Sequence, residues 1–114
     1  MNEPYYRTVR EMLADLAAKR MSARELLDAH VGRNDRLHAR LNAVIVSDIA
    51  RARKDAQAID DARVKGANLG ALAGIPMTVK DGFDVDGMPA AAGNPAFTTR
   101  PKACADAAVV ASVR

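Results

Sequence analysis

The chain has 114 residues, of which 49% are apolar and 27% charged, a composition that fits one modest globular domain and excludes a disordered or collagen-like chain. Its formal net charge is +3, and the basic excess lies in residues 1–66, where 13 Lys and Arg face 10 Asp and Glu. The single cysteine excludes an internal disulfide, no Cys/His cluster suits zinc, and no signal sequence or apolar run of about 20 residues is present, so we expect a cytoplasmic protein.

The first predicted element is a helix over residues 5–20. Apolar residues recur there at helical spacing and form one stripe. A second helix is expected to begin after Ser22, because Ser22 and Glu25 have the spacing of a capping box. Apolar positions at helical spacing continue from Leu26 to Leu37, so both helices should pack on another element.

The segment Leu41–Val46, LNAVIV, is short, apolar and rich in β-branched residues, which favours a buried strand. Ser47 and Asp48 then offer an N-cap for a third helix from Ile49. Its apolar positions are few and its charges many, so we expect a surface helix that ends before the glycines at 66 and 70.

After Gly70 the charge thins, and glycine, proline and β-branched residues dominate. Ile75–Val79 is predicted to be a short edge strand, because it contains a proline, and Phe83–Val85 a second one. Residues 87–102 should be irregular. A last helix is expected to start at Cys104 or Asp106 and to run to the end of the sequence.

One short segment combines an ionisable group with an apolar strand: GIPMTVKD, which ends in Lys80 and Asp81. Burial at the end of a strand would lower the pKa of a lysine and make it available as a neutral base. The other interpretation is a solvated ion pair between these two residues.

The whole run LAGIPMTVKDGFDVD resembles the lysine-bearing segment of the amidase signature family. Upstream, SARELLDAHVGRNDRLHARLNAVIV is similar to the family's N-terminal helix and the short strand after it. Downstream, FDVDGMP, the Ala92-Gly93 pair and the closing DAAVVASVR also follow the family's order. The resemblance covers residues 8–114.

The resemblance implies an α/β fold, of which this chain is the N-terminal portion: helices in the first half, then short core strands and a final helix. Residues 1–66 would form the helical layer and residues 67–114 the start of the core, in one incomplete domain. It further implies an amidase, a hydrolase that cleaves carbon–nitrogen bonds of amides with a Ser, cis-Ser, Lys triad. Such a hydrolase would need no cofactor and no metal.

Within that family pattern, Lys80 corresponds to the base of the triad. The neutral lysine would take a proton from a bridging serine, which takes one from the nucleophilic serine. Asp81 would be a structural acid that orients the loop, and Gly74 and Pro76 would shape the approach to the strand.

Several departures from the family pattern limit what this chain can do. Its only serines are Ser22, Ser47 and Ser112, and none lies in a glycine-rich loop, so both triad serines and the oxyanion donors of that loop are missing. The family's Thr-Thr is replaced by Ala90 and Ala91, and its following serine by Asn94. We therefore expect no activity from these residues alone.

Four other groups are candidate sites, and the structural interpretation is favoured for each. Ser112 is expected to be a plain helix-surface serine, and His30 and His38 to be packed or solvated, because no third metal ligand is apparent. Cys104 could be a reactive thiol at a helix N-terminus, although a small buried residue is favoured. Tyr5 and Tyr6 could stack on nucleic-acid bases, although helix packing is the safer interpretation.

Three functions compete on this sequence. The first is the front segment of an amidase, which would bind a small amide substrate only within a complete enzyme and would associate with the remainder of that enzyme or with itself. The second is a module whose arginine-rich helices bind nucleic acid or an acidic partner; interleaved acids disfavour it, so no nucleic acid is expected, nor a membrane. The third is a non-catalytic interaction or regulatory module that pairs with a larger amidase subunit.

Overall fold

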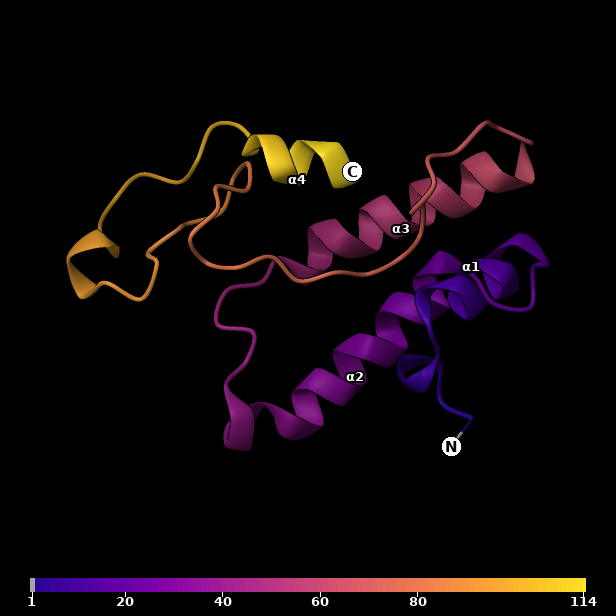
Figure 1. The fold of residues 1–114 in the computed structure, drawn as a ribbon, viewed down its shortest axis with the longest axis horizontal. Coiled ribbons are helices and arrows are strands. Elements are labelled where there is room, and N and C mark those ends of the chain that lie inside the picture. Colours follow the sequence, from indigo (N-terminus) through magenta and orange to yellow (C-terminus); the bar gives the residue numbers. More distant parts are fainter. Residues whose placement is uncertain (1) are drawn as a thin grey trace. The chain divides into compact units, whose positions relative to one another are not determined.

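The structure, a computed structural model, describes residues 2–114, and its regular elements are all helical (Figure 1). They are two 3-10 turns, η1 and η2, and the α-helices α1 to α4. Their bounds are η1 Pro4–Tyr6, α1 Val9–Ala17, α2 Ala23–Leu41, α3 Ile49–Val64, η2 Pro95–Phe97 and α4 Ala108–Val113.

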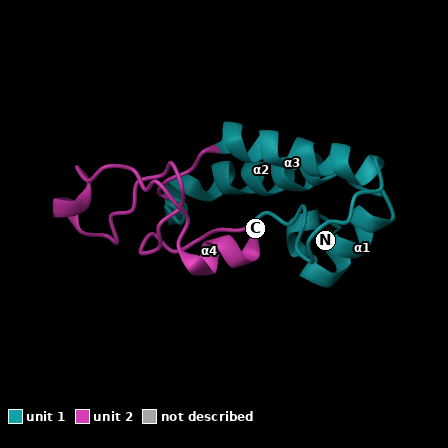
Figure 2. Ribbon diagram, turned by 90° about the horizontal axis from the view of Figure 1, so that it is seen from above, with its two compact units in different colours: residues 1–44, 49–76 teal, residues 45–48, 77–114 magenta. Residues whose placement is uncertain are grey.

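The chain forms two compact units, which Figure 2 shows in different colours. Unit 1 comprises the residues up to Val44 together with Ile49–Pro76, and so holds α1, α2 and α3. Unit 2 comprises Ile45–Asp48 and Met77–Arg114, and so holds η2, α4 and long stretches without regular structure.

Helices α1 and α2 begin at capping boxes. The Ser22 hydroxyl accepts from the backbone N–H of Glu25 at 3.1 Å, and the Glu25 carboxylate accepts from the N–H of Ser22 at 2.8 Å, which confirms the predicted start of α2. Thr8 and Glu11 form the same arrangement at α1. This second box was not predicted, and it explains why α1 starts at Val9 rather than near residue 5.

The core of unit 1 lies where its three helices meet. Leu26 of α2 is 0% exposed and Leu16 of α1 is 1% exposed, and α3 contributes the buried Ala56. The remaining buried members are Met12 and Ala23. Helix α3 buries only one small side chain among its residues, so it is a surface helix as predicted. Most of the core comes from the apolar side chains that recur at helical spacing in α1 and α2.

Polar side chains of α3 fasten it to α2. The Asp60 carboxylate accepts from the backbone N–H groups of Ala23 and Arg24, at 2.7 and 3.0 Å, so it caps the N-terminus of α2 from a neighbouring helix. Near the middle of both helices, the Arg53 guanidinium donates to Asp28 at 2.8 Å. The second contact lies at the surface and contributes little by comparison.

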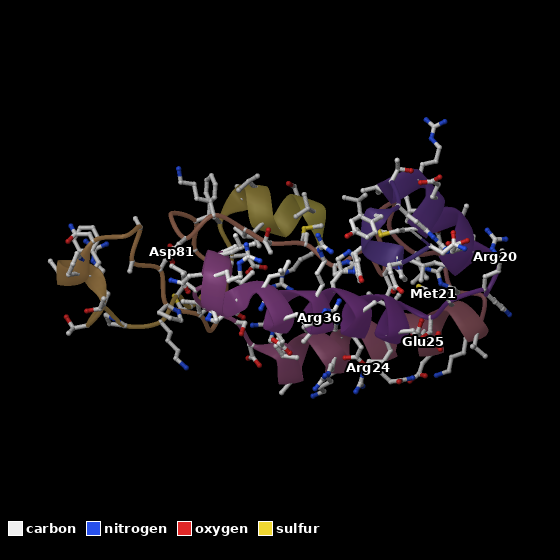
Figure 3. All side chains as sticks on the ribbon, turned by 90° about the horizontal axis from the view of Figure 1, so that it is seen from below. Arg20, Met21, Arg24, Glu25, Arg36 and Asp81 are labelled. Atoms are coloured by element: carbon white, nitrogen blue, oxygen red, sulfur yellow. The ribbon has the colours of Figure 1, made fainter. Side chains whose placement is uncertain are left out.

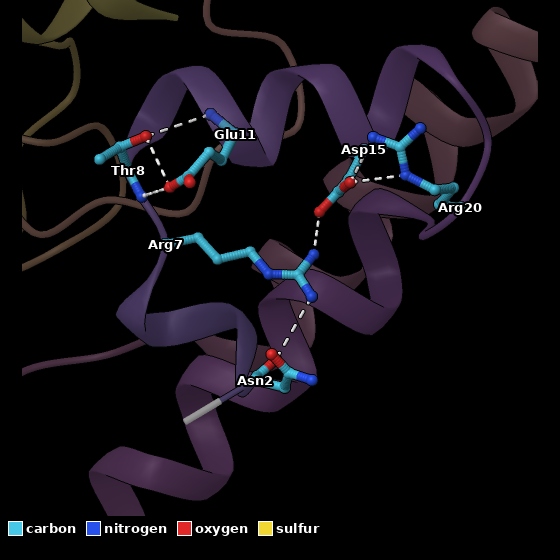
Figure 4. Close-up of polar contacts among 6 residues, drawn as sticks. All are labelled: Asn2, Arg7, Thr8, Glu11, Asp15 and Arg20. Atoms are coloured by element: carbon cyan, nitrogen blue, oxygen red, sulfur yellow. Dashed lines mark hydrogen bonds and ion pairs between the residues drawn. The ribbon is translucent and has the colours of Figure 1, made fainter.

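Asp15 is the buried charged residue of unit 1, 7% exposed, and it lies between two arginines (Figure 4). Arg20 donates to its carboxylate at 2.8 Å, and Arg7 donates to the second oxygen. The hydrogen bond from Arg20 and then the one from Arg7 hold the pKa of Asp15 below its usual range. Nothing in the spacing of the sequence predicted this cluster.

We expect the melting temperature of the chain to fall when the pH drops below about 4, the ordinary pKa of a carboxyl. A carboxyl whose pKa is lower in the folded state stabilises that state fully above its unfolded pKa, and this stabilisation is lost as the pH falls through the folded pKa. The pKa values of Glu11, Glu25 and Asp28 are lowered as well, by the backbone N–H of Thr8, the backbone N–H of Ser22 and the side chain of Arg53. Circular dichroism melts from about pH 6 to 2 measure the effect, with Asp15→Asn flattening the dependence. A melting temperature that rises on acidification contradicts this account.

The predicted strands are the main error of the sequence analysis. Within residues 2–114 the structure contains no β-strand, so the expected strands at Leu41–Val46, Ile75–Val79 and Phe83–Val85 are wrong for this chain. Their composition is strand-like, but a strand needs a neighbour to hydrogen-bond with, and the described segments do not pair into a ladder. The core strands of the expected α/β fold are therefore absent from this chain. Its described residues form helices joined by long stretches without regular secondary structure.

Unit 2 is held together by loop hydrogen bonds and one short helix. The N–H of Gly87 donates to Ala103 at 2.8 Å, and the N–H of Ala103 donates to Met88 at 3.1 Å, so the two ends of the irregular region lie side by side. The region is irregular as predicted, apart from η2. Helix α4 begins at Ala108, later than predicted, and no side chain caps it.

In the part of the chain that the structure describes, no helix is long and apolar enough to cross a membrane.

Candidate functional site

Lys80 lies in unit 2, at the end of a stretch that has no regular secondary structure. Its carbonyl accepts from the N–H of Phe83 at 3.0 Å, which closes a turn directly after the lysine. The Lys80 side chain is exposed in this chain, so the burial expected for it is absent here. No ion pair joins Lys80 to Asp81 among the described residues.

A shallow hollow of about 250 Å³ adjoins Lys80 within unit 2. One wall is the segment before the lysine, and the other is formed by apolar side chains of α4. Both walls expose apolar side chains: Val79 is 38%, Phe83 45% and Val109 49% exposed. The lining residues are Met77, Thr78, Val79, Lys80, Phe83, Val109, Val110 and Val113. The hollow therefore places one cationic group beside a mostly apolar surface.

Asp81 fastens the turn after the lysine to a distant loop. Its Oδ1 accepts from the N–H of Ala91 at 3.3 Å, and its backbone carbonyl accepts from the N–H of Ala92 at 3.1 Å. Ala92 has a φ of +50°, a left-handed conformation that costs a residue with a side chain some strain. The second carboxylate oxygen, Oδ2, is buried and has no hydrogen-bond partner among the described residues. Asp81, labelled in Figure 3, thus holds a strained loop in place.

Gly74 and Pro76 belong to unit 1 and precede the lysine segment. Gly74 has a φ of +93°, which only glycine adopts readily, and it lies against the buried core. Ile75, between them, packs on that core as a partly buried residue. Both residues act on the path of the backbone and carry no group for chemistry.

The three serines lie in places that do not suit a nucleophile. Ser22 is occupied in the cap of α2, and Ser47 is exposed. The Ser112 hydroxyl donates to the carbonyl of Val109 at 2.8 Å, as expected for a plain serine on a helix surface. No serine is among the residues that line the hollow next to Lys80.

The aromatic residues near the N-terminus pack on α2. The guanidinium carbon of Arg33 lies 4.6 Å from the centre of the Tyr5 ring and 4.8 Å from that of Tyr6, and its Nη1 donates to the Tyr6 hydroxyl at 3.0 Å. That hydrogen bond raises the pKa of Arg33. Arg36, on the same side of α2, donates to the Tyr5 hydroxyl at 3.2 Å. These contacts agree with the helix-packing interpretation.

The remaining candidate residues provide no site. The Nδ1 of His30 is 2.8 Å from the carbonyl of Leu26 in its own helix, and the residues described contain no group of three or more His, Cys, Asp or Glu placed to hold a metal ion. Cys104 is exposed, so the favoured interpretation of a small buried residue is wrong. It precedes α4 by several residues and does not lie at its N-terminus.

The sequence analysis did not identify two polar side chains of α3 that hydrogen-bond to the backbone of other segments. Asp60 and Arg63 lie three residues apart on α3, and each contacts backbone of another segment: Asp60 at the start of α2, and Arg63 at the carbonyl of Ala73. Residues three apart share a helix face, so the sequence could show that Asp60 and Arg63 lie on the same side of α3. Their backbone partners, which are distant along the chain, were not.

Comparison with known proteins gives one consistent result. The sequence profile of the family described as Amidase matches residues 25–114. The chain is 45% identical over 87 residues to a subunit of the glutamyl-tRNA(Gln) amidotransferase of Granulibacter bethesdensis, covering 76% of this chain and 17% of that protein. It is 43% identical over 76 residues to the indoleacetamide hydrolase of Bradyrhizobium diazoefficiens, covering 67% of this chain and 14% of that enzyme.

A third relative and a solved structure extend the match to most of the chain. The chain is 39% identical over 103 residues to AtzE of Pseudomonas sp. strain ADP, which belongs to a 1-carboxybiuret hydrolase, covering 88% of this chain and 22% of AtzE. A solved structure is described as an unexpected vestigial protein complex that reveals the evolutionary origins of an s-triazine catabolic enzyme. The match covers 92% of this chain and 23% of the solved chain. Its TM-score is 0.88 at 34% identity. The chain therefore spans about a fifth of the length of the proteins it matches.

Proposed function

Because this chain belongs to the amidase family, we propose that it is the front segment of an amidase-signature hydrolase, which cleaves carbon–nitrogen bonds of amides. In this proposal residues 1–66 form the helical layer of the amidase fold and residues 67–114 begin its core. The chain supplies one member of the catalytic triad, Lys80, and the remainder of the enzyme supplies the rest.

The observation that carries the proposal is the position of GIPMTVKD. The motif lies inside the region matched by the family profile, and the fold around it agrees with that of a solved relative at a TM-score of 0.88. A lysine beside a mostly apolar hollow is the arrangement in which desolvation by a covering segment would favour the neutral amine. Covering this hollow is the step that would turn an exposed lysine into a base.

The proposed chemistry divides the reaction between this chain and the rest of the enzyme. The neutral Nζ of Lys80 accepts a proton from the bridging serine, and that serine accepts the proton of the nucleophilic serine as it attacks the amide carbonyl. The proton then returns to the departing amine. Both serines and the oxyanion donors have to come from outside these 114 residues, because no serine lines the hollow.

We expect the 114-residue chain alone to release no ammonia from indoleacetamide, because a base without a nucleophile cannot form the acyl intermediate. A chimera, in which this chain replaces the matching front segment of the Bradyrhizobium indoleacetamide hydrolase, should release ammonia. An enzyme-coupled ammonia assay measures both, with the unaltered hydrolase as the reference. Hydrolysis by the chain alone, or a folded chimera without activity, contradicts the proposal.

A second candidate function is a non-catalytic module that pairs with a larger amidase subunit. The solved relative, which is described as a vestigial protein complex, favours it, as does the exposed apolar surface of unit 2. In that case the chain would bind an intact amidase in size-exclusion chromatography, and the chimera would be inactive. This pair of results separates the two functions.

A further inference from the structure

The start of α4 is hydrogen-bonded to the chain shortly after Lys80, within unit 2. The N–H of Ala107, the residue before the helix, donates to the Asp84 carbonyl at 2.9 Å. One side chain adds to this backbone contact: Oδ1 of Asp106 accepts from the N–H of Asp86 at 2.8 Å. Two successive residues ahead of α4 thus bind a segment that begins four residues after the lysine.

The Asp106 carboxylate also binds the far end of α4. Nε of Arg114, at the C-terminal cap of the helix, donates to its Oδ2, and Nη2 donates to its Oδ1 at 3.3 Å. The side chain of Asp106 is 14% exposed and that of Arg114 is 43% exposed. Because the arginine is nearly half exposed, this ion pair adds little stability. The bond to the backbone of Asp86 is the contact that joins α4 to another segment.

Helix α4 depends on such contacts for its position. It has 6 residues, well below the length of about 12–15 at which an isolated helix becomes stable in water, and no side chain caps its first turn. Its buried side chain is that of Val110, which is 4% exposed. Tertiary contacts at its start and along one face therefore determine where the helix lies.

The position of α4 in turn shapes the hollow beside Lys80. Three valines of the helix form one wall of this hollow, and the segment that carries Lys80 forms the other. Among the described residues that line it, Lys80 is the one whose side chain titrates. Apolar surface close to an ammonium group disfavours its charged form, so the distance of the valine wall affects how readily the amine becomes neutral.

We propose that Asp106 is a positioning residue for Lys80: by binding the backbone of Asp86, it holds α4 where its valines form the apolar wall beside the amine. This inference rests on the proposed catalytic function of Lys80, and it assigns no chemistry to Asp106. Asp106→Asn keeps an oxygen acceptor for the Asp86 N–H but loses the charge, whereas Asp106→Ala removes the acceptor. The two variants therefore separate the hydrogen bond from the ion pair.

The contact itself is tested in the 114-residue chain, independently of any activity. In Asp106→Ala, amide hydrogen exchange measured by NMR should speed up about tenfold at Asp86 and Ala107, because the junction opens locally. Asp106→Asn should leave both amides close to the parent. The matched control is Asp84→Ala, which removes an exposed carboxylate from the same segment and leaves the backbone carbonyl that binds Ala107. Equal exchange in Asp106→Ala and in this control overturns the inference.

The effect on Lys80 is tested in the chimera by the pH dependence of ammonia release, because the acidic limb of kcat reports the protonation of the base. In Asp106→Ala this limb should move to higher pH by roughly half a unit, since an amine with less apolar surface beside it stays protonated. At a pH below the limb, kcat then falls about threefold. Asp106→Asn and Asp84→Ala should keep the limb of the parent. A smaller amount of folded enzyme lowers the rate at every pH and leaves the limb in place.

The outcomes separate the positioning role from the proposed function. If Lys80→Ala leaves activity intact, the proposed function itself fails. If Lys80→Ala abolishes activity but the limb of Asp106→Ala coincides with that of the parent, the positioning role fails and the proposed function stands. Equal shifts in Asp106→Asn and Asp106→Ala also overturn the inference, because the ion pair would then be the contact that matters. Should Asp106→Ala not fold in the chimera, Asp106→Glu, which keeps the charge and displaces the acceptor, is measured for the same shift.

Discussion

Replacing Lys80 by alanine in the chimera is expected to lower kcat/KM for indoleacetamide by about 10²- to 10⁴-fold, the usual contribution of a positioned base. The loss should fall on kcat, because the amine acts in the proton transfer rather than in substrate binding. Lys80→Arg should lose activity to a similar extent. An arginine keeps the positive charge but stays protonated at any accessible pH.

The control for this experiment is Lys102→Ala, which removes an exposed lysine from the irregular region of unit 2. It should leave kcat/KM within about twofold, since surface substitutions away from a site have small effects. Unaltered far-UV circular dichroism in all three variants keeps misfolding apart from lost chemistry. Activity of Lys80→Ala equal to that of Lys102→Ala would remove Lys80 from the mechanism.

Leu26→Ala is expected to cost about 2–5 kcal/mol of the free energy of unfolding, the range for a buried leucine truncated to alanine. Leu26 is 0% exposed and lies at the centre of the small core where α1, α2 and α3 meet. The substitution would leave a cavity, and few other large side chains are buried in unit 1 that could move to fill it. A loss near the upper limit would be comparable to the whole stability of a small domain.

The matched control is Leu41→Ala, in the last residue of the same helix. Leu41 is 63% exposed, so its truncation should change the free energy of unfolding by no more than about 0.5 kcal/mol. Urea denaturation followed by circular dichroism measures both variants, with the slope of the transition as a check on the unfolded state. Equal losses in the two variants would mean that the core is not where the structure places it.

The helical half of the fold could be predicted because its signals are local. The capping box at Ser22 involves side chains three residues apart, and the apolar spacing of α1 and α2 is a property of each segment alone. The N-terminal boundary of α1 was wrong because the cap at Thr8 was overlooked. The Asp15 cluster and the Asp60 cap were out of reach, because their partners come from residues with no fixed spacing.

The strands failed for a different physical reason. Composition at Ile75–Val79 reports a preference for extended backbone, and the structure does leave this segment without helix. Pairing, however, depends on a second strand at the right distance, which a local pattern cannot reveal. In a relative of which this chain covers 22%, such a neighbour can come from another segment of the protein, so the composition indicated a preference and could not reveal a pairing partner.

The candidate site was recognised from a motif and then constrained by the structure. Resemblance singled out Lys80, and the structure adds the apolar hollow beside it and the loop that Asp81 holds. The family comparison confirms the resemblance itself, over residues 25–114. The catalytic role of Lys80 stays a prediction.

A crystal structure of the chimera tests the central claim most directly, because it shows what surrounds the amine of Lys80 once the rest of an amidase is present. The account predicts the Nζ of Lys80 at about 2.6–3.2 Å from a serine hydroxyl contributed by the hydrolase, with the hollow beside it covered. A Lys80 that remains exposed to solvent, with no serine hydroxyl in hydrogen-bond reach, would contradict it.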